Sequence, residues 1–297
     1  MVMSSQSQVR RILPWVLGMA VLLASLAAWA GNASSQRKLV EMSMLVTGEL
    51  VIAADGSVSE LQVDQREKLP PGVLQLVDQA KTQWRFEPIL VDGVARNVRS
   101  RMSLRVAAHR LESGDYSIGL RSAYFGKEAL AAQEKIDSQD TTTVRARKLT
   151  PPAFPQSAGM VGGRGIVYLV VRVGSDGTVT DTAVEQVNLQ VLGDDRTMKM
   201  LRKEFGNSAL RTSKYWTFDV PTTGEMADDG AWAVRIPVSF QYPGYERPGY
   251  GEWEAYVPGP RQSPPWAEND DAAEAMIAGG IYPVGQGLRL LTPLQSI

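Results

Sequence analysis

Two stretches of this sequence have the same pattern: Ile52–Val63, IAADGSVSELQV, and Val173–Val184, VGSDGTVTDTAV. In each, an Asp-Gly pair separates two runs in which β-forming residues alternate with polar ones. Asp-Gly readily supplies the positive backbone φ angles of a tight hairpin, so both stretches predict strand, turn and strand. The expected turn residues are Asp55 and Gly56 in the first stretch and Asp176 and Gly177 in the second.

The sequence that follows each hairpin also repeats. A helical stretch comes next, then a Trp-x-Phe motif, and then a strand, expected at residues 98–106 and 232–242. We therefore predict an α+β fold of two tandem ββαβ domains, each a small antiparallel sheet with one packed helix. Large aromatic side chains at the return from helix to sheet are typical of a core. The predicted core aromatics are Trp84, Phe86, Trp216 and Phe218.

Composition shifts set the expected domain boundaries. The first domain is expected at residues 40–108 and the second at 148–242, joined by a linker at 109–147 that includes a possible helix at 127–136. The C-terminal extension, residues 243–297, is rich in Pro, Gly and aromatic residues up to about Pro265 and predicts irregular structure there. A short helix is expected near 267–277, and the apolar end, residues 288–294, is expected to fold back onto a domain.

The N-terminus is typical of an export signal. Arg10 and Arg11 precede an apolar run, residues 12–30, that ends in the small-x-small motif Ala28-Trp29-Ala30. This pattern predicts a signal peptide, residues 1–30, cleaved to leave Gly31 first. The run is also near the ~20 residues that span a membrane, so an uncleaved anchor is the alternative.

Several motifs resemble the C-terminal domain of TonB energy transducers. The family's opening motif, P-x-Y-P-x-x-A, resembles Pro151–Pro155 with Ala158. The family's first hairpin resembles Gly165–Val173 with Asp176, Gly177 and Val179. The family's W-R-F-x-P segment resembles Gln83–Pro88 with Asp92-Gly93. The family's last strand, V-P-I-x-F, resembles Arg235–Phe240. The resemblance covers about residues 44–106 and 148–242, and its motifs occur in the same order in both copies.

This resemblance implies a periplasmic domain that docks onto outer-membrane receptors by pairing a sheet edge with a short segment of the receptor plug. Two departures separate the chain from a complete transducer. No long Pro/Lys/Glu-rich spacer lies between residues 31 and 44, and the only histidine, His109, is far from the apolar run.

The last strand of the second copy is the expected binding strand. A strand that follows the helix in a ββαβ unit can lie at the sheet edge, and Pro237 suits an edge because it lacks an N–H. Apolar side chains alternate here with Arg235 and Ser239, which predicts one face packed on the helix and the other in water. The predicted contact row is Val234, Arg235, Ile236, Pro237, Val238, Ser239 and Phe240. In the first copy the equivalent strand carries a basic stripe, Arg99, Arg101 and Arg105.

Composition gives no sign of catalysis. The 297 residues carry a net charge of −1 and no cysteine, so nucleic acid is not an expected partner and thiolate chemistry is excluded. His109 has no second histidine to complete a zinc site, and no nucleophile–base pair is visible. We expect no enzyme activity, no metal and no cofactor.

The sequence thus favours a periplasmic, non-enzymatic protein-binding protein associated with TonB-dependent transport across the outer membrane, with receptor plug segments as possible partners. One alternative is a membrane-anchored, atypical transducer component facing the periplasm. Another is a structural or assembly protein of the envelope.

Overall fold

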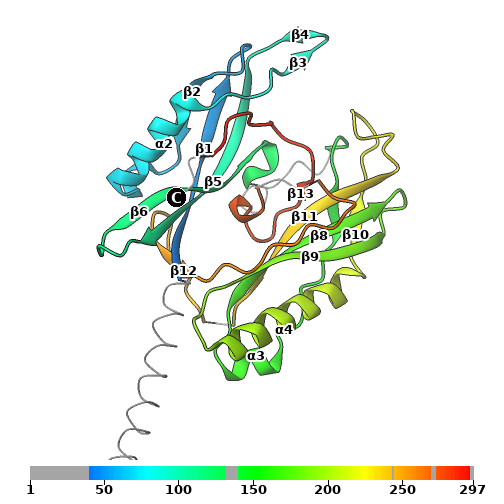
Figure 1. Cartoon of the computed structure of the whole chain (residues 1–297). Coiled ribbons are helices and arrows are strands. Elements are labelled where there is room, and N and C mark those ends of the chain that lie inside the picture. Colours follow the sequence, from blue (N-terminus) through cyan, green and yellow to red (C-terminus); the bar gives the residue numbers. More distant parts are fainter. Residues whose placement is uncertain (1–39, 131–139, 243, 269–271, 295–297) are drawn as a thin grey trace, which may run out of the picture. The chain divides into compact units, whose positions relative to one another are not determined.

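Two antiparallel sheets, each covered by a helix, organise the chain in a computed structural model (Figure 1). The structure describes residues 40–130, 140–242, 244–268 and 272–294. The chain divides into two parts, Met1–Leu39 and Val40–Ile297, and all described residues belong to the second part. The predicted signal peptide, residues 1–30, lies outside the described residues. Within the described ranges, no helix has both the length and the apolar character needed to cross a membrane.

The first sheet has the strand order β12-β1-β5-β6, with β2 paired to the other half of β1. Helix α2 (Pro71–Gln83) follows β2 and begins with a proline at its first helical position, as the sequence suggests. It buries Val73, Val77 and Ala80 against the sheet. The strands are β1 (Glu41–Ile52), β2 (Val58–Val63), β5 (Val98–Arg110), β6 (Tyr116–Phe125) and β12 (Glu254–Tyr256).

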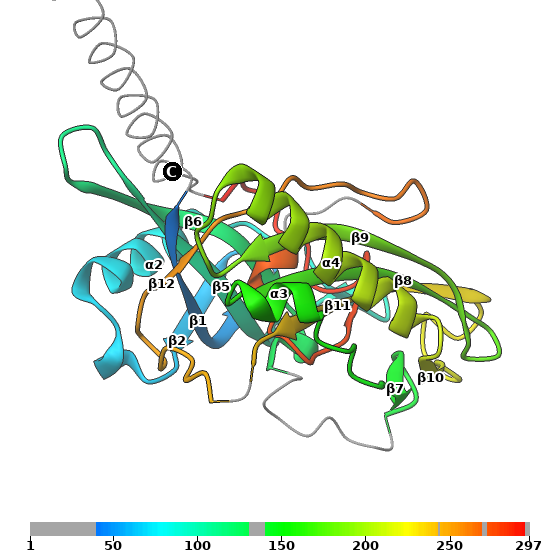
Figure 2. The same cartoon turned by 90° about the horizontal axis from the view of Figure 1, so that it is seen from below.

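The second sheet has the order β13-β11-β8-β9. Figure 2 shows α3 and α4 together on one side of it. The Asp194 side chain caps α4 by accepting a hydrogen bond from the Thr197 N–H at 2.7 Å. The elements are α3 (Gln156–Met160), β8 (Gly165–Gly174), β9 (Val179–Leu189), α4 (Asp195–Ser213), β11 (Ala231–Phe240) and β13 (Tyr282–Pro283).

Smaller elements complete the described chain. Two short strand pairs are β3 (Leu90–Val91) with β4 (Val94–Ala95), and β7 (Arg145–Lys148) with β10 (Thr217–Asp219). Three 3-10 helices lie at Arg66–Lys68, Lys127–Leu130 and Ala273–Ala275.

Both sheets are built on one plan. The order β1, β2, α2, β5 matches β8, β9, α4, β11, and in each set the first strand lies between the second and the last. At the two hairpins Gly56 and Gly177 have φ angles of 82° and 77°. The Phe86 N–H donates to the Gly56 carbonyl at 2.8 Å, and the Phe218 N–H donates to the Gly177 carbonyl at 2.9 Å. The two stretches of like sequence therefore form the same local structure.

The aspartates of the two turns also have the same role. Asp55 Oδ1 accepts the Ser57 N–H at 2.9 Å, and Asp176 Oδ1 accepts the Thr178 N–H at 2.9 Å. These bonds, together with bonds from the hydroxyls of the same two residues, lower the pKa of each carboxyl. An ionised aspartate is thus the better acceptor in both turns.

Each sheet has its own apolar core beneath its helix. Trp84 and Phe86 are fully buried in the first and pack edge-to-face with Phe125, at ring-centroid distances of 5.3 Å and 4.9 Å. Trp216 and Phe218 are fully buried in the second. All four predicted aromatics therefore lie at the junction of helix and sheet.

The segments outside the predicted domains differ from our expectations. The region predicted as a linker contains β6, a full strand of the first sheet. Of the helix expected at 127–136, the described residues form a 3-10 turn at Lys127–Leu130, and 131–139 lie outside the description. Of the helix expected near 267–277, the described residues form a 3-10 turn at Ala273–Ala275, and 269–271 lie outside the description. The expectation that the apolar end folds back is confirmed, because Leu288, Leu290 and Leu294 pack on the first core.

Candidate functional site

The strand predicted to bind a partner, β11, is not at an open edge. The chain's own β13 pairs with it, placing Val234 opposite Pro283 and Arg235 opposite Tyr282. Further along, the Val284 N–H donates to the Ala233 carbonyl at 2.9 Å. The placement of β11 at a free edge is therefore wrong, because β13, for which the sequence predicted no strand, supplies the missing neighbour.

The C-terminal segment that contains β13 also pairs with the later part of β11. The Gly279 N–H donates to the Pro237 carbonyl at 3.1 Å. Of the predicted contact row, Val234, Ile236 and Phe240 belong to the apolar core under α4. The row lies along one strand as predicted, but part of its edge is already paired.

The face of β11 that we expected in water is also covered. Arg235 is only 1% exposed and forms an ion pair with Glu185 of β9, which is fully buried; the closest N–O distance is 2.7 Å. Arg261, in the C-terminal extension, donates to the same carboxylate at 2.9 Å. A buried carboxylate is tolerated when it is paired in this way. Alternation placed Arg235 correctly on the face opposite the core, but that face is not solvated.

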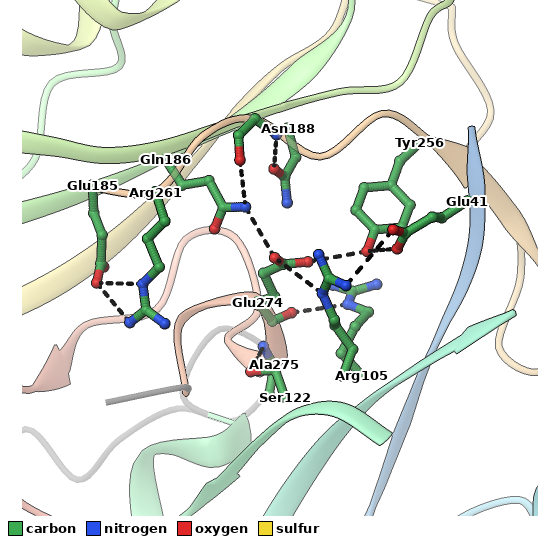
Figure 3. Close-up of polar contacts among 12 residues, drawn as sticks. Glu41, Arg105, Ser122, Glu185, Gln186, Asn188, Tyr256, Arg261, Glu274 and Ala275 are labelled. Carbon is green, nitrogen blue, oxygen red and sulfur yellow. Dashed lines mark hydrogen bonds and ion pairs between the residues drawn. The ribbon is translucent and has the colours of Figure 1, made fainter. Parts of the chain in front are cut away.

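Residues around Glu274 connect this buried face to the first sheet, as Figure 3 shows. The Gln186 amide of β9 donates to Glu274 Oε1 at 3.0 Å. From the first sheet, the Arg105 guanidinium donates to the Glu274 carbonyl oxygen at 2.8 Å. The segment that carries Glu274 thus contacts both sheets, on the faces that point away from their helices (Figure 1).

A tyrosine hydroxyl lies between two carboxylates in this region. Tyr256 OH is 3.0 Å from Glu41 Oε2 and 3.1 Å from Glu274 Oε2. Burial raises the pKa of Tyr256, and the two glutamates raise it further. Arg121 of β6 lies 3.6 Å from Glu41 Oε1 and 3.8 Å from Glu274 Oε1. Burial alone would lower the pKa of Arg121, but the nearby Glu274, Tyr256 and Glu41 outweigh it and raise the pKa.

A small polar cavity adjoins this network. Its volume is about 250 Å³, and its lining comprises Arg121, Ser122, Gln186, Gly259, Arg261, Ala273 and Glu274. Its two arginines are paired with carboxylates, Arg121 with Glu41 and Glu274, and Arg261 with Glu185. Glu274 contacts both Arg121 of β6 and Gln186 of β9, so the arrangement cross-links the sheets. The described residues hold no group of three or more His, Asp or Glu side chains suited to a metal ion.

The predicted basic stripe of β5 is likewise engaged. Arg99 pairs with Glu49 and Arg101 lies 3.5 Å from Asp64, while Arg105 bonds to the C-terminal segment. The stripe is therefore compensated by acidic and carbonyl groups instead of facing an acidic partner.

Sequence reasoning missed Tyr256, Glu274 and Glu185. The first two lie in the extension: Tyr256 is in a three-residue strand within its Gly- and Pro-rich part, and Glu274 is in a 3-10 turn where the sequence predicted a helix. Glu185 gave a weak signal, because it is a charged residue in a strand that ends in a buried run.

Comparison with known proteins shows a limited similarity. The chain is 28% identical over 98 residues to Protein TonB of Xanthomonas campestris pv. campestris strain B100. It has the same identity over the same length to Protein TonB of strain ATCC 33913. The match covers 33% of this chain and 37% of each relative, so the chain spans little more than a third of their length. No family model and no solved structure matches. The similarity suggests a TonB-like relationship at most.

Proposed function

We propose that this chain is a periplasmic, non-enzymatic protein-binding protein that contains two ββαβ units like the C-terminal domain of TonB. The first unit comprises β1, β2, α2 and β5, and the second comprises β8, β9, α4 and β11. We further propose that it works with outer-membrane receptors in TonB-dependent transport. The observation that carries the proposal is the recurrence of one strand–strand–helix–strand unit with matched turns, in a chain that shares sequence with Protein TonB.

The physical basis for binding is the sheet edge. An extended peptide that pairs with an edge strand gains main-chain hydrogen bonds, and alternate side chains give selectivity. In this proposal the partner is a plug segment of a receptor, and it takes the edge of β11 that the chain's own β13 occupies in the structure.

Crosslinking in intact cells tests this function. A photo-crosslinking residue replaces Ala233 of β11, and a matched variant carries it at Arg99 of β5, the equivalent position of the first unit. Capture of outer-membrane receptors from position 233 is expected, with weaker capture from position 99. Capture of only further copies of this chain would support an assembly protein instead.

A further inference from the structure

The edge of β11 is covered by residues 277–284, which we call the clasp. We propose that the clasp is a built-in competitor for the β11 edge, held in place by the first unit, and that a partner peptide binds by displacing it. This inference rests on the proposed function and assigns different tasks to the two units: the second binds, and the first controls access.

The clasp has only a limited hold on β11. Pairing involves two residues of β13, one of which is Pro283, and a proline donates no ladder hydrogen bond. Two further backbone bonds come from Val284 and Gly279. Short edge pairing of this kind opens at low free-energy cost compared with a central strand.

The chain just before the clasp is held much more firmly, and by the first sheet. Ser103 Oγ of β5 donates to the Ala275 carbonyl at 2.6 Å, and the Ala275 N–H donates to Ser122 Oγ of β6 at 3.0 Å. Both serines are buried, so these bonds are shielded from water. The Arg105 and Tyr256 contacts to Glu274 add to the same anchor.

Apolar packing also holds the clasp itself to the first sheet. Tyr282 stacks edge-to-face on Tyr124 of β6 with 5.1 Å between ring centroids. These rings share a small buried cluster with Ala129, Ala275 and Met276. The clasp is thus held by the first sheet through this cluster, and its contacts with the second sheet are the backbone bonds to β11 and the burial of Ile281 in the second core.

The clasp also keeps its own shape. The Tyr282 hydroxyl accepts the Ile277 N–H at 2.8 Å and donates to the Ile277 carbonyl at 3.1 Å, closing a loop around Gly279, whose φ is 95°. A loop closed by its own side chain can leave β11 without losing its local bonds. The apparent association constant of the partner is then the intrinsic constant multiplied by the fraction of time that the edge is uncovered.

A disulfide lock tests the clasp directly, because the chain has no other cysteine. Ala233 and Val284 are joined by a backbone bond across the two strands, and directly opposed antiparallel residues fall within disulfide range. In the variant A233C/V284C, oxidation ties the clasp to β11 and reduction releases it. The single variants A233C and V284C serve as controls.

The probe is a labelled peptide with the clasp's own sequence, residues 277–284, added to the full chain. It requires no knowledge of the natural partner. We expect it to bind the reduced lock variant and to lose at least ~10-fold in affinity on oxidation. The double variant S103A/S122A removes the two hydrogen bonds that hold Ala275 to the first sheet. In this variant we expect the labelled peptide to bind more tightly, by roughly fivefold for each lost hydrogen bond.

Amide exchange provides the second measurement. If the clasp opens, the Gly279 and Val284 amides exchange much faster than those of central strand β8. Equal peptide affinity in the oxidised and reduced variants would overturn the proposal. The proposal would also be overturned if the Gly279 and Val284 amides were protected from exchange as strongly as the amides of β8, because the clasp would then be a permanent part of the sheet. If the lock behaves as expected but no receptor is captured in cells, the clasp stands and the proposed function fails.

Discussion

At the scale of single residues, the matched turn glycines are the clearest link from sequence to fold. A Cβ at Gly56 or Gly177 would overlap the carbonyl oxygen of Phe86 or Phe218, and both positions have positive φ. We expect Gly56→Ala and Gly177→Ala each to lower the free energy of unfolding by about 1–3 kcal/mol, measured by chemical denaturation.

Gly93 provides the control for these substitutions. Its φ is 73°, but a Cβ there would have no neighbour within 4 Å. Gly93→Ala carries the conformational strain alone, so its loss of stability should be smaller. Equal losses at all three glycines would show that the approach of Phe86 and Phe218 does not constrain the turns.

The buried pair of Arg235 and Glu185 makes a second residue-scale prediction. Replacing Arg235 by methionine leaves the Glu185 carboxylate buried with less compensation, which costs about 3–5 kcal/mol of unfolding free energy. Arg261→Met removes a partner that is 26% exposed and should cost less. Denaturation of both variants decides the point; an R235M protein as stable as the wild type would show that the pair contributes nothing net.

At the scale of secondary structure, the two hairpins and α2 were predictable because their signals are local. Asp-Gly pairs, the two prolines at the start of α2 and the alternation in β5 and β11 all lie within a few residues of the structure they specify. Strands β12 and β13 could not be predicted in this way. They have two or three residues each and exist only because β1 and β11, distant in sequence, offer unpaired edges.

The two core tryptophans make a prediction at the same scale. Trp216 Nε1 donates to the Thr150 carbonyl at 2.8 Å, whereas Trp84 Nε1 is buried with no partner among the described residues. Trp216→Phe leaves a carbonyl unsatisfied, while Trp84→Phe removes an unpaired donor. We expect W216F to be less stable than W84F by about 1 kcal/mol. Paired denaturation curves test this, and the reverse order would contradict it.

At the scale of the whole described unit, the C-terminal extension joins the two copies. It adds β12 to β1, pairs Val257 with Leu189 of β9 and covers β11 with the clasp. Because a single segment closes edges in both sheets, it also protects them from pairing with other chains. The two sheets, which share one strand order, therefore have different environments, and the similar sequence patterns alone do not indicate this.

Alkaline pH tests how this extension holds the molecule together. Burial raises the pKa of four tyrosines, Tyr168 of β8 and, in the extension, Tyr250, Tyr256 of β12 and Tyr282 of β13. A phenol with a higher pKa in the folded state stabilises the fold below the unfolded-state pKa of about 10, and this contribution is lost as pH rises further. Three of the four rings lie in the extension, so loss of stability at high pH reports on its contacts.

We expect the free energy of unfolding to fall above about pH 10, by up to roughly 1.4 kcal/mol per pH unit for each buried tyrosine. Tyr256→Phe removes one ionisable group and should reduce this slope, whatever it does to stability at neutral pH. Tyr215→Phe is the control, because Tyr215 is 78% exposed. Denaturant titrations across about pH 9 to 11 measure the three slopes. A Tyr256→Phe slope equal to that of the wild type would mean that this hydroxyl is ionised as easily in the folded chain as in the unfolded one, and that the contact between Glu41, Tyr256 and Glu274 does not hold the extension in place.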